Sequence, residues 1–354
     1  MPFQKPHSAA AVPDTAIKES GSTQTSLRPR RDLLGSPQTG PRLWGNLPRA
    51  VRALLFRLAY TIPVVWLVVS IVFLLIHLVP GDPIEQMLGE GARPADIVAL
   101  RHAYGLDQPL GRQYLHYWAG VLHGNLGSSI RLNDSITHLV LSRYPYTVEL
   151  TIAALIIAIL LSVPAGIASA LHRDRWQDRT LSFVSLLGLS FPPFALGPIL
   201  IVLISIKLGR LPVSGTGGIT HLILPAVTMG SALAAILTRM VRTAMLEELG
   251  QDYIRTARAK GLPERTVVYK HALRNALIPV ITLLGLQFGA LLAGAIVTEK
   301  IFSWPGIGRL TLDAISNRDY PLLQGCILAI GLTYVLVNLA TDVMYLVVNP
   351  RIRD

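Results

Sequence analysis

Charged residues and cysteine are both scarce in this sequence. Only 15% of its 354 residues are charged, whereas 51% are hydrophobic. A soluble domain is rarely so apolar. The single cysteine, Cys326, excludes an intrachain disulfide framework and a cysteine-based zinc site. The composition therefore predicts a membrane protein that contains no internal disulfide.

The sequence also lacks the motifs of common catalytic and nucleotide sites. It has no Gly-x-x-x-x-Gly-Lys-Ser/Thr loop to hold a phosphate, no His-Glu-x-x-His and no Gly-x-Ser-x-Gly. Ionisable residues are rare inside the apolar blocks, whereas ion-coupled carriers usually place such groups at mid-membrane. We therefore expect no catalytic, cofactor or metal site in this chain, and no ATP hydrolysis by it.

Long apolar blocks dominate what is present. A helix needs roughly 20 apolar residues to cross the hydrocarbon core, and six blocks are long enough, at about 53–79, 147–171, 181–208, 222–246, 276–297 and 325–348. The fold class predicted is an all-α membrane protein with six transmembrane helices. An even number of spans places both chain ends on the same side of the membrane.

The net charge of +11 could suggest nucleic acid as a partner. Its distribution favours another explanation, because Lys and Arg concentrate in the N-terminal arm and in the loops on the same side as that arm. This is the positive-inside asymmetry of membrane proteins. We therefore expect both termini in the cytoplasm, membrane lipid as the surrounding partner, and no nucleic acid.

The polar segments divide the chain further. Residues 1–46 are rich in Ser, Thr, Pro, Gly and Arg and should form a disordered cytoplasmic arm, which leaves 47–354 as the transmembrane domain. The largest insertion, 80–144, is expected to be an external loop. Within it, 94–105 and 110–122 have the spacing of two short amphipathic helices.

A basic, polar stretch separates the fourth and fifth apolar blocks. Asp252 can cap a helix that begins at Tyr253, Gly261 can end it, and Pro263 can start the helix that continues into the fifth span. The small residues Thr256, Ala257, Ala259 and Gly261 would lie on the surface of this stretch and let another protein approach the backbone closely. The stretch is either a docking surface for a partner ATPase or an ordinary amphipathic connector.

Several motifs occur together in the order of one family. Ala257 to Gly261, followed by His271-Ala-Leu-Arg-Asn-Ala-Leu-Ile-Pro279, resembles the Glu-Ala-Ala–Gly loop of ABC importer permeases, although Arg255 stands where that motif has Glu. The chain resembles more specifically the permeases of dipeptide and oligopeptide importers, the DppB/OppB type. The matching stretches are Leu78-Val-Pro-Gly-Asp-Pro83, Tyr104-Gly-Leu-Asp-Gln-Pro109, Gly124-Asn-Leu-Gly-Ser-Ser129, Leu211-Pro-Val-Ser-Gly215, Gly250-Gln-Asp-Tyr-Ile-Arg-Thr-Ala-Arg-Ala-Lys-Gly261, Phe302-Ser-Trp-Pro-Gly-Ile-Gly-Arg309, Arg318-Asp-Tyr-Pro321 and Asn349-Pro-Arg-Ile-Arg353.

The resemblance implies a type I ABC importer permease fold in the bacterial cytoplasmic (inner) membrane. It implies a heterodimer with a sister permease, two ATP-binding subunits that hold ATP and Mg, and an extracytoplasmic substrate-binding protein. The coupling helix that docks on the ATPase would comprise Tyr253, Ile254, Arg255, Thr256, Ala257, Arg258, Ala259, Lys260, Gly261 and Leu262.

The cargo implied by the resemblance is dipeptides or oligopeptides. Nickel chelates or glutathione are alternatives within the same importer type. A stand-alone ion-coupled carrier or channel is the alternative from a different class.

Overall fold

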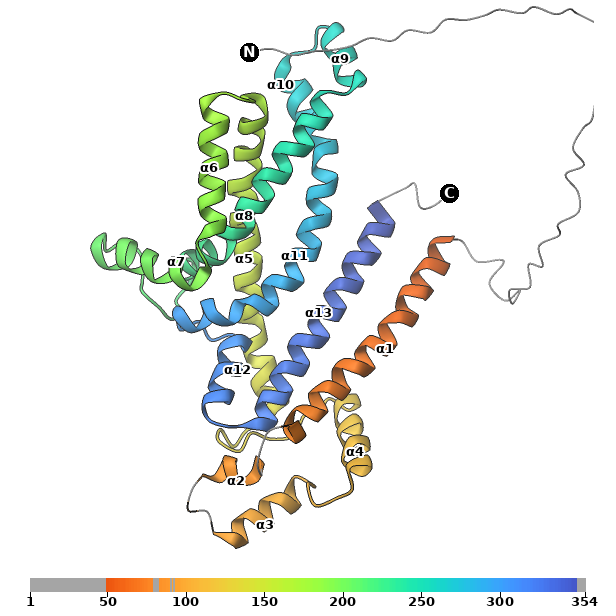
Figure 1. The fold of residues 1–354 in the computed structure, drawn as a ribbon, viewed down its shortest axis with the longest axis vertical. Coiled ribbons are helices and arrows are strands. Elements are labelled where there is room, and N and C mark those ends of the chain that lie inside the picture. Colours follow the sequence, from red (N-terminus) through yellow and green to blue (C-terminus); the bar gives the residue numbers. More distant parts are fainter. Residues whose placement is uncertain (1–48, 79–82, 90, 92, 349–354) are drawn as a thin grey trace, which may run out of the picture. The chain divides into compact units, whose positions relative to one another are not determined.

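The computed structural model describes residues 49–78, 83–89, 91 and 93–348. The predicted arm 1–46 lies outside these residues. The regular secondary structure of the described residues is helical, apart from an isolated bridge between Ser128 and Ser135. The elements are α1 (Arg49–Leu78), α2 (Pro83–Leu88), α3 (Pro94–Ala103), α4 (Leu110–Leu122), α5 (Ile136–Leu171), α6 (Trp176–Ser190), α7 (Pro193–Leu200), the π-helical segment η2 (Ile201–Lys207), α8 (Ile219–Leu249), α9 (Asp252–Ala259), α10 (Glu264–Thr266), the π-helical segment η3 (Val267–Ala272), α11 (Leu273–Ile301), α12 (Ile307–Ser316) and α13 (Tyr320–Val348) (Figure 1).

Five of the helices in the described residues are long and apolar enough to cross a membrane, and a sixth span exists if one bent pair is counted. The five lie in α1, α5, α8, in the run from α10 into α11, and in α13. They coincide with five of the six predicted blocks. The all-α membrane fold is therefore confirmed, with five candidate spans, or six if the bent pair counts as one span.

The predicted span 181–208 consists of two helices and is not one continuous helix. Trp176–Ser190 and Pro193–Lys207 meet at an angle of 103°. Pro192 and Pro193 supply no backbone N–H, and a residue before proline disfavours helical dihedral angles. Phe191 accordingly ends α6 in an extended conformation, with φ −90° and ψ 108°.

The second predicted span begins earlier than expected. We expected the external loop to run to residue 144 and the helix to start at 147, but α5 starts at Ile136 and passes through Pro145. Ile136 and Val140 are buried in a cluster with Ile307 and Leu323. This burial offsets the hydrogen bond that Pro145 cannot donate.

Helices α5 and α8 pack closely at two positions that bear no side chain, which we call the α5–α8 seam. A Cβ on Gly230 of α8 would lie 2.6 Å from the carbonyl oxygen of Ala154, and one on Gly166 of α5 would lie 2.6 Å from Val241. Only glycine permits such an approach. The seam joins the two longest helices of the fold.

The Gly-x-x-x-Gly pair in the fifth span packs within this chain. A Cβ on Gly285 would lie 2.7 Å from Thr341, and one on Gly289 would lie 3.1 Å from Tyr334. Both partners are on α13, which in turn lies beside α1 (Figure 1). The glycine pair therefore joins α11 to α13.

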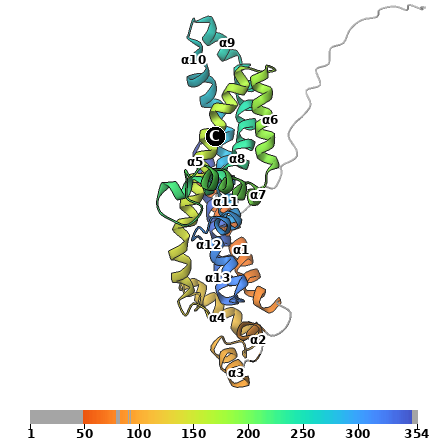
Figure 2. The ribbon, with the colours of Figure 1, turned by 90° about the vertical axis from the view of Figure 1, so that its left-hand side faces the viewer.

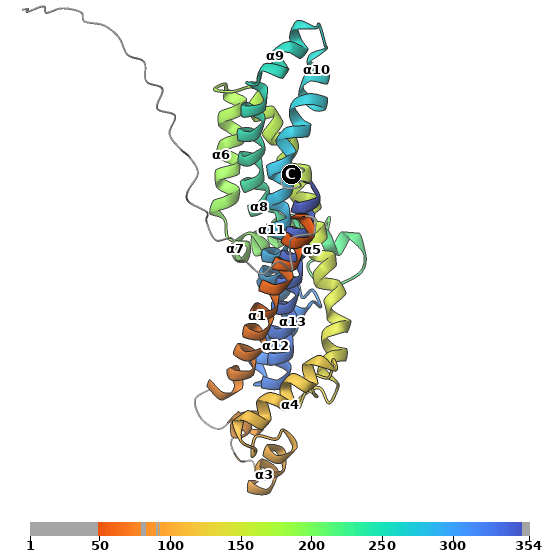
Figure 3. The ribbon, with the colours of Figure 1, turned by 90° about the vertical axis from the view of Figure 1, so that its right-hand side faces the viewer.

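Two groups of short helices lie at opposite ends of the described part of the chain. Helices α9 and α10 lie at one end, which we call the α9 end, and α2, α3 and α4 lie at the other, the α3 end (Figures 2 and 3). Helices α3 and α4 confirm the two short helices predicted over 94–105 and 110–122. His77 of α1 is bonded to Gln113 of α4 at 3.0 Å, which ties the insertion to the first span.

Candidate functional site at the α9 end

One face of helix α9 is buried against the rest of the bundle. Ile254 is completely buried and Ala257 is 8% exposed, and both belong to a cluster that includes Val267 and Val268 of η3. Their spacing of three residues places them on one side of the helix. The apolar face of α9 therefore packs against the start of the fifth span.

The start of α9 lies one residue earlier than predicted. We expected Asp252 to cap the helix, but Gln251 holds the cap position, with φ −74° and ψ 151°. The Gln251 carbonyl accepts the N–H groups of Ile254 at 3.1 Å and Arg255 at 3.3 Å. Asp252 lies instead in the first turn, where its negative charge still faces the positive end of the helix dipole.

The end of α9 is confirmed at Gly261, whose φ is +76°. Its N–H donates to the carbonyl of Arg258 at 2.9 Å, and the N–H of Leu262 donates to that of Ala257 at 3.3 Å. This is the Schellman pattern, which satisfies the last carbonyls of a helix. Pro263 then caps α10, which runs through η3 into α11.

Side chains also tie α9 to its neighbours. Asn275 of α11 donates to the Tyr253 hydroxyl at 3.0 Å, and that hydroxyl donates to the Glu248 carboxylate of α8. Burial and the adjacent Glu248 carboxylate raise the pKa of Tyr253, so the phenol stays neutral. Arg258 forms a two-pronged ion pair with Glu264, at 2.7 and 3.2 Å.

The predicted docking residues divide into two groups. Ile254 and Ala257 face inward and are unavailable to a partner, which corrects our view of Ala257 as a small surface residue. The exposed group is Tyr253, Arg255, Thr256, Arg258, Ala259, Lys260, Gly261 and Leu262. The surface of α9 is therefore basic with two small positions, Thr256 and Ala259.

An ion pair missed by sequence reasoning joins α5, α6 and α8. Arg242 donates from Nε and Nη2 to the two carboxylate oxygens of Asp178, both at 2.7 Å. Asp178 also accepts from the Ser169 hydroxyl and from the N–H of Asp174 at 3.0 Å. The Asp178 side chain is only 6% exposed, so these donors stabilise a charge that would otherwise be costly to bury.

Two of the motifs quoted in the sequence analysis, 124–129 and 318–321, meet at the α3 end. The Asp319 carboxylate, buried at 1% exposure, accepts from the Ser129 hydroxyl, from the N–H of Arg131 at 3.3 Å and from the N–H of Leu322 at 3.2 Å. The bond from Leu322 makes Asp319 the cap of α13. The 124–129 turn and the 318–321 motif thus form one polar junction.

The motif 302–309 has a structural basis in Glu299, which is fully buried. Its carboxylate accepts from the Thr147 hydroxyl at 2.6 Å and from the N–H of Arg309 at 2.8 Å, so it caps α12. A Cβ on Gly306 would lie 2.1 Å from this carboxylate. Trp304 donates from its indole nitrogen to the Tyr146 carbonyl at 2.8 Å, which fixes the loop against α5.

Comparison with known families covers most of the chain. Residues 162–354 match the family described as "Binding-protein-dependent transport system inner membrane component". Residues 50–151 match the N-terminal model "Binding-prot-dependent transport system membrane comp, N-term". Together the two matches reach every candidate span of the structure, and only residues 152–161 of α5 fall between them.

Similar proteins include the glutathione transport system permease protein GsiC of Escherichia coli strain K12. It is 45% identical over 297 residues, which are 84% of this chain and 97% of GsiC. The GsiC protein of Salmonella typhimurium strain LT2 is 46% identical over the same shares. Among solved structures, the MetNI methionine ABC transporter in an inward-facing form matches 59% of this chain and 96% of its own, with a TM-score of 0.50 and 17% identity.

Proposed function

Because this chain belongs to the family of binding-protein-dependent transport system inner membrane components, the permease subunits of ABC importers, we propose that it imports short peptides, with glutathione among its cargoes. The chain is a multi-pass inner-membrane permease subunit and has the type I importer fold. Transport permease subunits of this kind are not catalytic.

The cargo proposal has two supports. The similar relatives carry the name of a glutathione transport permease, and glutathione is itself a tripeptide. The motifs of the peptide-importer type point to the same chemical class. A nickel chelate is the remaining candidate within this importer type.

The proposed assembly follows from the family. A sister permease would complete a heterodimer, two ATP-binding subunits would hold ATP and Mg, and a substrate-binding protein would deliver the cargo. We propose that the α9 end faces the cytoplasm, which agrees with the concentration of Lys and Arg in the loops at that end. The α3 end would then meet the substrate-binding protein.

Helix α9 carries the docking proposal. It is a short helix with one face fixed in the core and the other exposed, and it is rigidly joined to α8 and α11. A force on its exposed face would therefore reach two spans. Packed interfaces tend to switch between discrete arrangements rather than bend gradually, so this connection suits an ATP-driven change of the bundle.

The docking proposal is tested with Thr256→Trp/Ala259→Trp, which enlarges the two small positions of the exposed face. The whole importer is purified through a tag on this chain, and the recovered ATPase is quantified. We expect the ATPase to be lost while the permease remains in the membrane. Ser316→Trp, an exposed small residue at the end of α12, is the matched control and should retain it. Full ATPase recovery with the double variant would refute α9 as the docking element.

The cargo proposal is tested by uptake in cells that lack this chain. We expect loss of labelled glutathione and dipeptide uptake, restored by the wild-type chain. Loss of nickel uptake with peptide uptake intact would replace the peptide proposal.

A further inference from the structure

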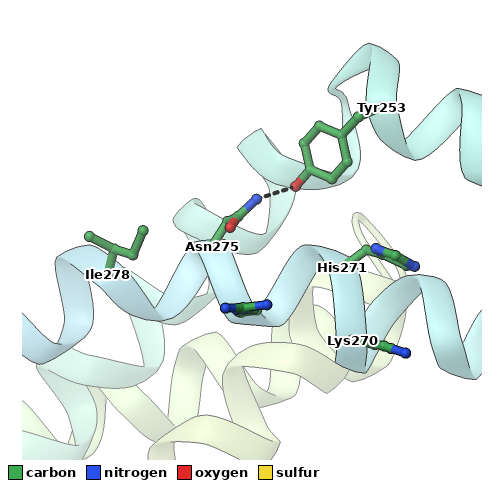
Figure 4. A pocket seen from close by; sticks show the side chains of 6 residues that line it. Tyr253, Lys270, His271, Asn275 and Ile278 are labelled. Carbon is green, nitrogen blue, oxygen red and sulfur yellow. Dashed lines mark hydrogen bonds between the residues drawn. The ribbon is translucent and has the colours of Figure 1, made fainter. Parts of the chain in front are cut away.

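An open cavity of about 460 Å³ lies beside α9. Its lining comes from α9, η3 and α11: Tyr253, Lys270, His271, Arg274, Asn275 and Ile278. Figure 4 shows the Tyr253 ring reaching from α9 toward Asn275, with His271 and Lys270 further along. The cavity is thus formed where the polar end of the fifth span passes under α9.

The charged side chains that line the cavity are all basic, and the Glu248 carboxylate that is bonded to Tyr253 is not among the lining residues. Lys270 and Arg274 are four residues apart, so they lie on one side of the helix with His271 next to them. In the portion of the chain that the structure describes, none of these three side chains has an ion pair or hydrogen bond. Arg258 of α9, in contrast, is neutralised by Glu264.

One edge of the cavity is apolar. Ile278 lines it and is 52% exposed, and Ile281 on the next turn is 42% exposed. Both lie inside the candidate span Glu264–Leu292. The basic side chains belong to the same span, nearer its polar N-terminal end, and the exposed apolar surface of Ile278 and Ile281 follows them along the helix.

From this juxtaposition we infer that the cavity binds the headgroup of an anionic phospholipid. Lys270 and Arg274 pair with the phosphate, Arg274 through two parallel N–H donors. The acyl chain lies along Ile278 and Ile281. Basic pockets between spans at the membrane surface suit such headgroups. An acidic loop of a soluble partner would satisfy the charge but would leave the isoleucine edge without a partner.

The site also has a consequence for α9. Tyr253 lines the cavity and belongs to α9, while its hydroxyl bonds to Glu248 and Asn275. A bound headgroup therefore touches the proposed docking helix. Lipid occupancy and the position of α9 are linked through this one side chain, independently of which cargo is carried.

The test uses the full chain in phosphatidylcholine nanodiscs with a minor fraction of spin-labelled phosphatidylglycerol or spin-labelled phosphatidylcholine. The fraction of immobilised label gives the relative affinity of the two lipids. Lys270→Gln/Arg274→Gln should lower the preference for phosphatidylglycerol by about 25-fold, because each basic side chain at a membrane surface is worth about fivefold. Arg210→Gln/Arg265→Gln, which removes two exposed charges outside the cavity, should leave the preference unchanged.

A second arm separates lipid from free phosphate. Ile278→Ser should weaken phosphatidylglycerol binding but leave any binding of inorganic phosphate to the detergent-solubilised chain unaltered. If inorganic phosphate displaces phosphatidylglycerol and Ile278→Ser has no effect, the site is an anion site and the lipid inference fails.

A third arm addresses a protein occupant. If Lys270→Gln/Arg274→Gln leaves lipid preference intact but reduces ATPase recovery, the cavity belongs to the partner interface. An equal loss in both double variants would show a non-specific surface charge effect and would also overturn the inference. Each variant is compared with the wild type by gel filtration, so that a misfolded chain is recognised.

Discussion

Replacing Asp319 by alanine would disrupt the polar junction at the α3 end. The carboxylate accepts from Ser129, Arg131 and Leu322 and is almost fully buried. Alanine removes the carboxylate that accepts these hydrogen bonds. The donors in the segment 129–131 and in the first turn of α13 then lose their shared acceptor. The helix cap of α13 is lost at the same time.

The expected cost follows from these contacts. A hydrogen bond to a charged group contributes about 1.5–3 kcal/mol, and the two backbone bonds, at 3.2 and 3.3 Å, belong at the lower end of that range. Loss of a cap costs about 1 kcal/mol. Since these contributions overlap, we expect Asp319→Ala to lower the free energy of unfolding by about 3 kcal/mol.

Cys326 provides the assay because it is the sole cysteine of the chain and is fully buried, seven residues after Asp319 on the same helix. Its side chain packs in the cluster formed by α5, α12 and α13. When opening and closing are fast relative to labelling, the rate of reaction with a maleimide fluorophore follows the population of the open form. A loss of about 3 kcal/mol then raises the labelling rate by about 100-fold.

Asp313→Ala is the matched control. Asp313 lies on α12 with its side chain 42% exposed, and it pairs at the surface with Lys300 and Arg309. Surface pairs contribute about 0–1 kcal/mol, so the labelling rate should change by less than about fivefold. The reasoning is refuted if Asp319→Ala has no more effect than the control. It also fails if Ser129→Ala and Asp319→Ala are additive, because residues that share a bond should be coupled.

Two further changes test other contacts. Gly230→Ala should lower the free energy of unfolding by about 1–3 kcal/mol, because its Cβ would meet the Ala154 carbonyl oxygen at 2.6 Å. Gly188→Ala is the control and should be tolerated, because the nearest neighbour of its Cβ would lie at 3.5 Å. The midpoint of SDS unfolding in mixed micelles measures both variants. Arg242→Gln should cost about 3 kcal/mol because it leaves the buried Asp178 carboxylate without its counter-ion. Asp178→Asn/Arg242→Gln should cost clearly less than the sum of its single variants in the same unfolding measurement, and strict additivity would argue against the pair.

The spans could be predicted because each one contains a continuous apolar run in the sequence. The break in the third span could not be predicted from apolarity, since hydrophobicity stays high across Pro192 and Pro193 and carries no information about direction. The early start of α5 could not be predicted because its first residues do not form a continuous apolar run. Residues 136–144 mix polar and apolar side chains, and only the burial of Ile136 and Val140 shows that they belong to the bundle.

The end of α9 was predictable because glycine tolerates the left-handed conformation at Gly261. The polar junctions were not, because their members lie far apart in sequence: 190 residues separate Ser129 from Asp319, and 64 separate Asp178 from Arg242. The cavity beside α9 could not be predicted from the sequence either. Lys270 and Arg274 are ordinary basic residues in the sequence, and they become a site only when α9 folds back over them.

The α5–α8 seam limits how this molecule can move. At Gly230 and Gly166 the neighbouring helix enters the space that a side chain would fill, so sliding of either helix along the other would bring backbone atoms into collision. These two helices must therefore move together as one rigid piece. Any rearrangement that opens or closes a passage has to take place where α11 and α13 meet that piece, and not inside it.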